Sequence, residues 1–359
     1  MKQAYPDSVW YNLLYSDLFY QFQRNPSSLR RQLRANPPGE RPVIIDEIQK
    51  LPKLLDEIQA LIDEDQISFI LTGSSARKLK AGGANLLGGR ARFITLHPFA
   101  FPELTASYPE MSPMELISLM IQRGTLPPIW LSDDPHADLL AYCGAYLKEE
   151  IQAEAVVRKL DNFSRFLGSL GTMNSQELNY EEIARDCSVP PRTVREYLGI
   201  LEDTLIAQVL EPWKAGRKRK SVSRGKLYFF DHAVARTLAG SPVATEGTSE
   251  WGRAFEAIIY QELRAYISYQ KSYSNLTYWR TIDQREVDFI LDDSVAIEIK
   301  ASSRIHPKDL KGLRNITEEG TWKHRILVCT IQKAELTDEG ILVLPVEDFL
   351  TRLWSGQFD

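Results

Sequence analysis

The chain has 359 residues, of which 43% are hydrophobic and 25% charged, and its formal net charge is −5 at pH 7. Because a domain averages about 150 residues, this length predicts two or three globular domains. The net negative charge excludes a uniformly basic nucleic-acid binder, and no apolar run approaches the roughly 20 residues of a membrane helix. The scattered cysteines Cys143, Cys187 and Cys329 form no metal-binding pattern and are typical of a cytoplasmic protein.

The first part of the chain alternates between strand and helix patterns. In chain order these are a strand at 8–14, a helix at 27–35, a strand at 42–46, a helix at 53–64, and strands at 68–75 and 92–104. Alternation of this kind favours an α/β fold with a parallel sheet covered by helices. In such sheets ligands bind where the strands end, so residues after neighbouring strands are expected to lie together.

Two acidic residues follow the second of these strands, in the stretch VIIDEIQKLP. A buried strand that delivers Asp46 and Glu47 to a sheet edge is typical of phosphate sites. The usual partner is a glycine-rich loop, GxxxxGK[ST], that holds the nucleotide phosphates, and the sequence does not contain one. The alternative interpretation of DEIQK is an exposed acidic helix start after a strand.

The middle of the chain is helical from about residue 113 to 165 and then changes character. Residues 179–206 predict a short helix, a turn over Ser188–Pro191 and a second helix, which is the helix-turn-helix pattern. Two strand patterns follow, at 207–213 and 226–231. Together these elements predict a winged helix.

The segment that joins the last two strands is strongly basic. No acid occurs between Glu211 and Asp231, whereas the following basic residues do: Lys214, Arg217, Lys218, Arg219, Lys220, Arg224 and Lys226. Cationic side chains in one hairpin neutralise DNA phosphates, so a basic wing that contacts DNA is predicted. The alternative is a solvated hairpin tip.

The last part predicts a small α/β domain, with a helix at 251–267, strands at 276–281, 286–291 and 295–302, a helix near 308–313, strands at 325–330 and 341–346, and a closing helix. Asp288 lies within one strand, and Glu298 and Lys300 point to one side of the next. With Glu256 on the helix, these carboxylates offer hard oxygen ligands to Mg²⁺, and the lysine can activate water. The alternative is a structural salt bridge among Asp, Glu and Lys.

This last arrangement resembles the PD-(D/E)XK nuclease superfamily over about residues 251–346, although EVDF has no proline before the aspartate. The resemblance implies that Glu256, Asp288 and Glu298 are ligands of Mg²⁺ or Mn²⁺. It also implies that Lys300 is the catalytic lysine.

Along the whole chain, VIIDEIQKLP, FILTGSSARKL, the GGR ending at Arg90, LHPFAFPEL and YFFD resemble a bacterial and archaeal family of AAA+-type ATPases with a C-terminal nuclease-like domain. That resemblance implies that Asp46 holds Mg²⁺ through water and that Glu47 polarises the attacking water. Thr72 or Ser74 would sense the γ-phosphate of ATP, and Arg90 would reach the nucleotide of a neighbouring subunit in a homo-oligomer. The family's glycine-rich loop precedes the segment that here begins MKQAYPDS, so we expect a lost P-loop, through a late or misassigned start or a real decay, and an inactive ATPase.

These patterns predict four parts: a truncated AAA+-like core at 1–112, a helical lid or linker at 113–170, a winged helix at 171–240 and a nuclease-like domain at 251–359. The leading interpretation is an ATP-binding protein coupled to a Mg²⁺-dependent, DNA-binding, nuclease-like domain. The predicted DNA contacts are Arg192, Arg195, Arg217, Lys218, Arg219 and Lys220. The alternative is a regulatory or scaffold protein with a dead nucleotide site and a nuclease-like fold that only binds.

Overall fold

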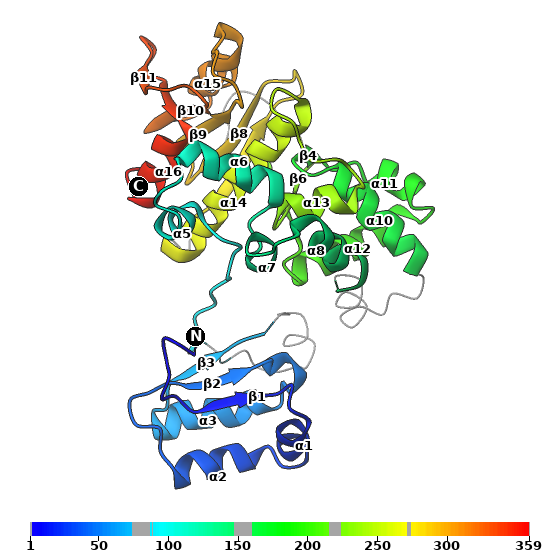
Figure 1. Ribbon diagram of the computed structural model, residues 1–359, viewed down its shortest axis with the longest axis vertical. Helices are drawn as coiled ribbons and strands as arrows, with labels where there is room; N and C mark the ends of the chain where they lie inside the picture. The colour runs from blue at the N-terminus through cyan, green and yellow to red at the C-terminus, as the bar shows by residue number, and fades with distance from the viewer. Residues whose placement is uncertain are drawn as a thin grey trace. The chain divides into compact units, whose positions relative to one another are not determined.

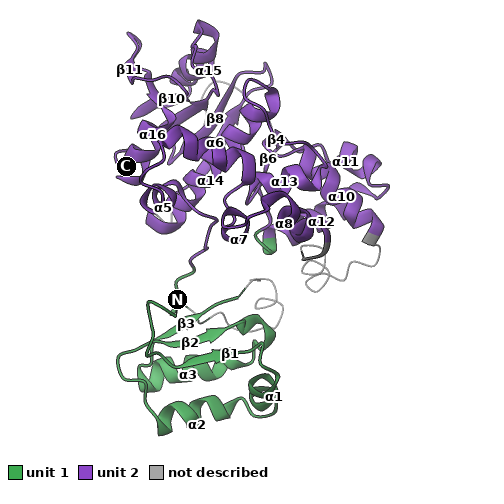
Figure 2. Cartoon of the chain, viewed as in Figure 1, with its two compact units in different colours: residues 1–93, 203–205 green, residues 94–202, 206–359 purple. Residues whose placement is uncertain are grey.

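The computed structural model describes residues 2–73, 87, 89–146, 160–214, 224–270 and 274–358. The chain divides into two compact units, residues 1–93 with 203–205 and residues 94–202 with 206–359 (Figure 2). Within the described ranges, no helix is long and apolar enough to cross a membrane. The four predicted domain boundaries stay a prediction.

The first unit is a three-stranded parallel sheet in the order β1 (Trp10–Asn12), β2 (Val43–Asp46) and β3 (Phe69–Leu71). Its helices are α1 (Ser16–Arg24), α2 (Ser27–Ala35) and α3 (Leu54–Asp65), with the short 3₁₀-helix η1 (Ile48–Lys50) after β2 (Figure 1). The β-branched run of β2 favours a strand, and α3 buries apolar residues at helical spacing against it. The predicted alternation of strand and helix is confirmed up to β3.

The strand predicted at 92–104 is wrong. Residues 92–98 form no regular element, and helix α5 (Phe101–Ser107) begins inside the predicted strand. A strand exists only where a neighbour pairs its backbone groups, and in the described part of the sheet β3 pairs with β2 alone. Phe93, Ile94 and Leu96 are accordingly exposed, although their apolar character suggested a buried strand.

The second unit contains a six-stranded sheet in the order β11-β12-β10-β9-β8-β7. Its strands are β7 (Leu276–Arg280), β8 (Glu286–Leu291), β9 (Val295–Ile299), β10 (His324–Cys329), β11 (Glu335–Leu336) and β12 (Leu342–Pro345). Strands β7, β8 and β9 form an antiparallel meander, whereas β10 runs parallel to both β9 and β12. The strands and the helices that the sequence predicts for this domain are present.

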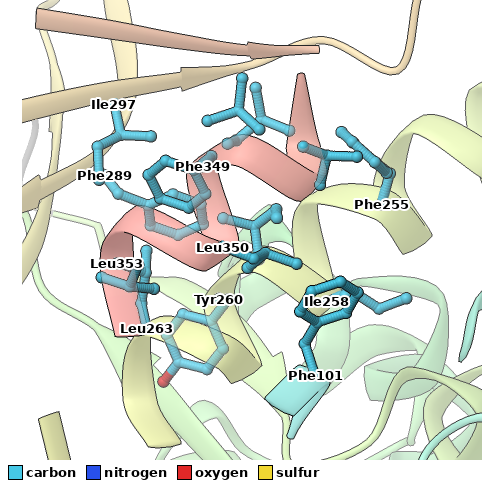
Figure 3. Packing of buried hydrophobic residues seen from close by; sticks show 14 of the residues in the cluster. Phe101, Phe255, Ile258, Tyr260, Leu263, Phe289, Ile297, Phe349, Leu350 and Leu353 are labelled. Atoms are coloured by element: carbon cyan, nitrogen blue, oxygen red, sulfur yellow. The ribbon is translucent and has the colours of Figure 1, made fainter. Parts of the chain in front are cut away.

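Helices cover both faces of this sheet because its residues alternate between two cores. On one face, α14 (Ser249–Gln270) and α16 (Val346–Trp354) pack on Phe289 and Ile297, as Figure 3 shows. On the other face, Ala296 and its neighbours pack on η3 (Pro307–Leu310), α15 (Lys311–Asn315) and η4 (Ile316–Glu318). Strand periodicity of two places Ala296 and Ile297 on opposite sides.

The same unit also holds a helical part that includes a small sheet. Its helices are α6 (Pro113–Arg123), α7 (Pro127–Trp130), α8 (Pro135–Ala141), the π-helix η2 (Tyr142–Tyr146), α10 (Leu160–Thr172), α11 (Tyr180–Asp186), α12 (Pro191–Asp203) and α13 (His232–Leu238). The sheet has the order β4-β6-β5, from β4 (Gln176–Glu177), β5 (Ala207–Leu210) and β6 (Lys226–Phe229), and all its pairs are antiparallel. The predicted helix pair, its turn and the two following strands are therefore present.

Candidate functional site

The carboxyl ends of β1, β2 and β3 bring four polar residues together, which we call the carboxyl edge (Asn12, Asp46, Glu47 and Thr72). Asn12 lies directly beside Asp46 in the strand register, and its Nδ2 donates to Asp46 Oδ2 at 3.2 Å. The Thr72 hydroxyl donates to the other carboxylate oxygen, Oδ1. Asp46 is therefore held at the edge by a donor on each side.

Glu47 adopts an unusual backbone conformation at this edge. Its φ of 61° and ψ of 40° are left-handed, which costs a non-glycine residue about 1–2 kcal/mol. The amide of the buried Gln49 donates to Glu47 Oε2 at 2.7 Å, and the Ile48 N–H donates to the Thr72 carbonyl at 3.0 Å. Strained residues of this kind are concentrated at functional sites, but several other described residues share a positive φ, and the role of Glu47 stays a prediction.

Two residues at this edge were missed by the sequence reasoning. Asn12 could have been found in part, since it is a polar residue within the strand predicted at 8–14, but its position level with Asp46 needs the observed register. Gln49 gave no such signal, because a 3₁₀ turn and not a regular helix places its side chain beside Glu47. A Cβ on Gly73 would overlap the Gln49 side-chain oxygen, so glycine fits this approach best.

The remaining residues predicted for the nucleotide lie elsewhere or are not described. Arg90 contacts Asp63 of α3, with 2.6 Å between Nε and Oδ1. Ser74 lies outside the described residues.

The second unit brings the acids and lysine of the C-terminal domain together. The carboxylate cluster, as we call it, consists of Glu256 on α14, Glu286 and Asp288 on β8, and Glu298 on β9. Lys300, just after β9, lies with its Nζ 2.7 Å from Glu298 Oε1. The backbone N–H of Ile299 donates to Asp288 Oδ2 at 2.8 Å. The predicted convergence of these side chains is present.

A lysine from β6 occupies the middle of the cluster. The Nζ of Lys226 lies 2.5 Å from Glu286 Oε1, and 3.4 Å from both Glu256 Oε1 and Asp288 Oδ1. Its side chain is 4% exposed. The sequence reasoning counted Lys226 with the exposed basic wing, and this is wrong, because β6 packs its side chain against the C-terminal domain.

Burial dominates the electrostatics of the cluster. It raises the pKa of Glu256 to about 7, against the opposing charge of Lys226. Burial and then the charge of Asp288 raise the pKa of Glu298 well above its usual value. For Lys226, burial alone would lower the pKa, but the carboxylates, Glu256 first, outweigh it, so the pKa is well above its usual value and the lysine is charged.

Because most carboxylate oxygens of the cluster already have partners, the cluster does not fit a resident divalent metal. Asp288 already accepts from Ile299 and contacts Lys226, and Glu298 contacts Lys300. Among the carboxylate oxygens of the cluster, Glu298 Oε2 is the one that is buried without a hydrogen-bond partner in the described part of the chain. Over the described ranges, no group of three or more His, Cys, Asp or Glu side chains has the arrangement of a metal centre.

The predicted DNA-contacting helix does not present a basic surface. Arg192 pairs with Glu196 at 3.1 Å, and the Arg195 guanidinium lies 4.8 Å from the Tyr180 ring centroid. Helices α11 and α12 together contain more acidic than basic residues. Arg217, Lys218, Arg219 and Lys220 lie outside the described residues.

Comparison with known proteins divides the chain into three matched segments. Residues 2–105 match a family described as an AAA domain. Residues 114–244 match a domain of unknown function (DUF8612), and residues 251–349 match another (DUF4143). An uncharacterized protein of Haemophilus influenzae is 22% identical over 360 residues, which cover 94% of this chain and 86% of that protein.

No solved structure matches the chain significantly. The parallel sheet of the first unit agrees with the AAA match, and AAA domains in general use a nucleotide and Mg²⁺. The matches at the two ends of the chain support an AAA-type ATPase family.

Proposed function

We propose that the first unit is the nucleotide site of an ATPase-like protein and that its carboxyl edge faces the phosphates. The observation that carries this proposal is the orientation of Asp46 by Asn12 and Thr72 at the ends of three parallel strands. Parallel α/β sheets bind their ligands at this edge. The match of residues 2–105 to an AAA domain supports the same assignment.

The residues of the edge have distinct roles in this proposal. Asp46 would hold Mg²⁺ through water, and the ion, when bound, neutralises charge on the phosphate oxygens. Glu47 orients and polarises the attacking water, with its own carboxylate positioned by Gln49. Thr72 fixes Asp46 and responds to the terminal phosphate. The oriented Asp46 carboxylate is of the hard-oxygen type that Mg²⁺ prefers, so these residues fit the ion.

The first prediction concerns nucleotide binding by the 359-residue chain. Because no GxxxxGK[ST] loop is present to cradle the phosphates, we expect weak binding of ATP that requires Mg²⁺, without turnover. Asp46→Asn should abolish this binding in a calorimetric titration. The control Asp65→Asn, at the C-terminal end of α3 and outside the carboxyl edge, should leave ATP binding unchanged.

Two results would contradict the nucleotide proposal or its premise. ATP binding that is identical in Asp46→Asn and the wild type would mean that the carboxyl edge is not the site. Tight ATP binding, or steady hydrolysis that Glu47→Gln abolishes, would mean that another part of the chain cradles the phosphates.

The C-terminal domain is, in this proposal, a PD-(D/E)XK-like domain that acts at DNA. Its support is the convergence of Glu256, Asp288, Glu298 and Lys300 from one helix and two adjacent strands. The helix pair α11 and α12, together with the β4-β6-β5 sheet, is the winged-helix part of this proposal. Because α11 and α12 are acidic on balance, the basic segment between β5 and β6 is the proposed DNA contact.

The second prediction concerns this DNA contact. We expect weak binding to duplex DNA without sequence preference, since each neutralised phosphate adds about 0.9 to the slope of log affinity against log salt concentration. Changing Arg217, Lys218, Arg219 and Lys220 together to Ala should flatten that slope, as measured by fluorescence anisotropy at several salt concentrations. Changing Arg192 and Arg195 to Ala should have a smaller effect, because both side chains have intramolecular partners.

An unchanged salt dependence in the quadruple variant would show that the basic segment is a solvated turn. A larger effect of the change at Arg192 and Arg195 would move the DNA contact to helix α12.

A further inference from the structure

Lys226 lies at the point where the carboxylates of the cluster converge. Its Nζ is equidistant, at 3.4 Å, from Glu256 Oε1 on α14 and Asp288 Oδ1 on β8, and it also contacts Glu286. Glu256 and Asp288 are two of the three ligands that the PD-(D/E)XK resemblance assigns to a metal. The ammonium of Lys226 therefore contacts two of the residues that would have to hold the metal.

The carboxylates of the cluster are neutralised by cationic side chains of the protein itself, among them Lys226. The carboxylates Glu256, Glu286 and Asp288 contact Lys226, and Glu298 contacts Lys300. Arg280 lies beside Glu286, with 3.4 Å between Nη1 and Oε2, and also pairs with Glu177. Without the Lys226 ammonium, Glu256 and Asp288 would lose the cation that contacts both of them. With it, a metal would meet a buried positive charge at hydrogen-bond distance from its own ligands.

Strand β6 is fixed in a way that keeps Lys226 in this position. The Tyr228 hydroxyl, two residues along the strand, donates to Glu256 Oε1 at 2.6 Å, and the Tyr228 ring stacks on Tyr260 of α14 at 3.9 Å. The Tyr278 hydroxyl donates to the Arg224 carbonyl just before β6, and the Tyr278 ring centroid lies 5.3 Å from Lys226 Nζ. The Lys226 side chain is buried, and the strand that carries it is packed on the same domain. The ammonium therefore stays in the cluster as long as β6 keeps this packing.

We infer that Lys226 is the resident cation of the carboxylate cluster, and that it excludes a divalent metal for as long as β6 is packed on the C-terminal domain. The inference rests on the nuclease-like fold proposed above. The new element is that strand β6, which precedes this domain, supplies the cation. The metal site is then latent: it becomes available only when the Lys226 ammonium is removed. In this state Glu256, Glu286 and Asp288 anchor the β4-β6-β5 sheet through Lys226 and do not hold a metal.

The test is a Mn²⁺ titration of the full-length chain by calorimetry. The wild type should bind Mn²⁺ only weakly at the carboxylate cluster. Lys226→Met, which keeps the length of the side chain and removes its charge, should bind one Mn²⁺ there at least about tenfold more tightly. The double variant Lys226→Met with Asp288→Asn should lose that site. The charge-conserving Lys226→Arg should resemble the wild type.

Two outcomes would overturn the inference: wild-type protein that binds Mn²⁺ as tightly as Lys226→Met, or folded Lys226→Met that binds none. If Lys226→Met does not fold without metal, refolding with Mn²⁺ should restore cooperative unfolding, and failure to restore it would also overturn the inference. DNA cleavage by Lys226→Met in the presence of Mn²⁺ is measured in a separate assay. A Mn²⁺ site without cleavage supports the latent site and counts against the proposed nuclease-like action on DNA.

Discussion

Lys226→Met is expected to lower the free energy of unfolding by about 3–5 kcal/mol at pH 8 in the absence of divalent metal, because it leaves buried carboxylates without their counter-charge. Three carboxylates contact the Lys226 ammonium, and two of them, Glu256 and Asp288, have little exposed side chain. Urea unfolding followed by circular dichroism measures the loss. The control Lys323→Met, at an exposed lysine of the same domain, should change stability by less than about 0.5 kcal/mol.

The pH dependence of this loss follows from the carboxyl groups. The pKa of Glu256 is raised from 4.5 to about 7, so this group favours the folded state below about pH 4.5, and that contribution is lost as the pH rises through 7. Removal of Lys226 would raise the pKa of Glu256 further, since a neighbouring cation is lost. The variant should therefore lose less stability at pH 5, where the carboxyls take up protons, than at pH 8. An equal loss at both pH values would mean that packing, and not charge, holds Lys226.

The sequence predicts best those features that depend on neighbouring residues. The strand β2 with Asp46 at its end, and the alternation that turns Glu298 and Lys300 to one side, are consequences of local periodicity. Whether an apolar run forms a strand is harder to predict, because a strand is stable only when a neighbouring strand pairs with it. The apolar run at 92–104 therefore predicted a strand that the structure does not contain.

The role of Lys226 could not be predicted from local pattern. It is 62 residues from Asp288 in sequence, and the two meet only because β6 packs on the C-terminal domain. Along the chain, Lys226 ends a run of basic residues, so composition assigned it to an exposed wing. One feature of the sequence agrees with burial: Lys226 begins the strand pattern KLYFFD, which is otherwise apolar up to its final aspartate.

The other large effect is expected at Asp231, the last residue of KLYFFD. Its Oδ1 caps α13 by accepting from the backbone N–H groups of Ala233 at 2.8 Å and Val234 at 3.2 Å, and its Oδ2 accepts from Thr125 N at 2.7 Å. Loss of a helix cap costs about 1–2 kcal/mol, and a buried N–H left without a partner costs about 1–3 kcal/mol more. Asp231→Ala should therefore lower the free energy of unfolding by about 2–5 kcal/mol, measured by urea unfolding.

A second helix cap separates the two parts of this effect. Asp134 caps α8 by accepting from Ala137 N at 3.1 Å, but it is exposed, so Asp134→Ala should cost only about 1 kcal/mol. The difference between the two variants measures what the bond from Thr125 to Asp231 adds. The backbone at Gly124, with a φ of 77°, approaches so closely that a Cβ there would lie 2.5 Å from Asp231 Oδ1. If Asp231→Ala costs no more than Asp134→Ala, this close approach does not stabilise the junction between α6 and α13.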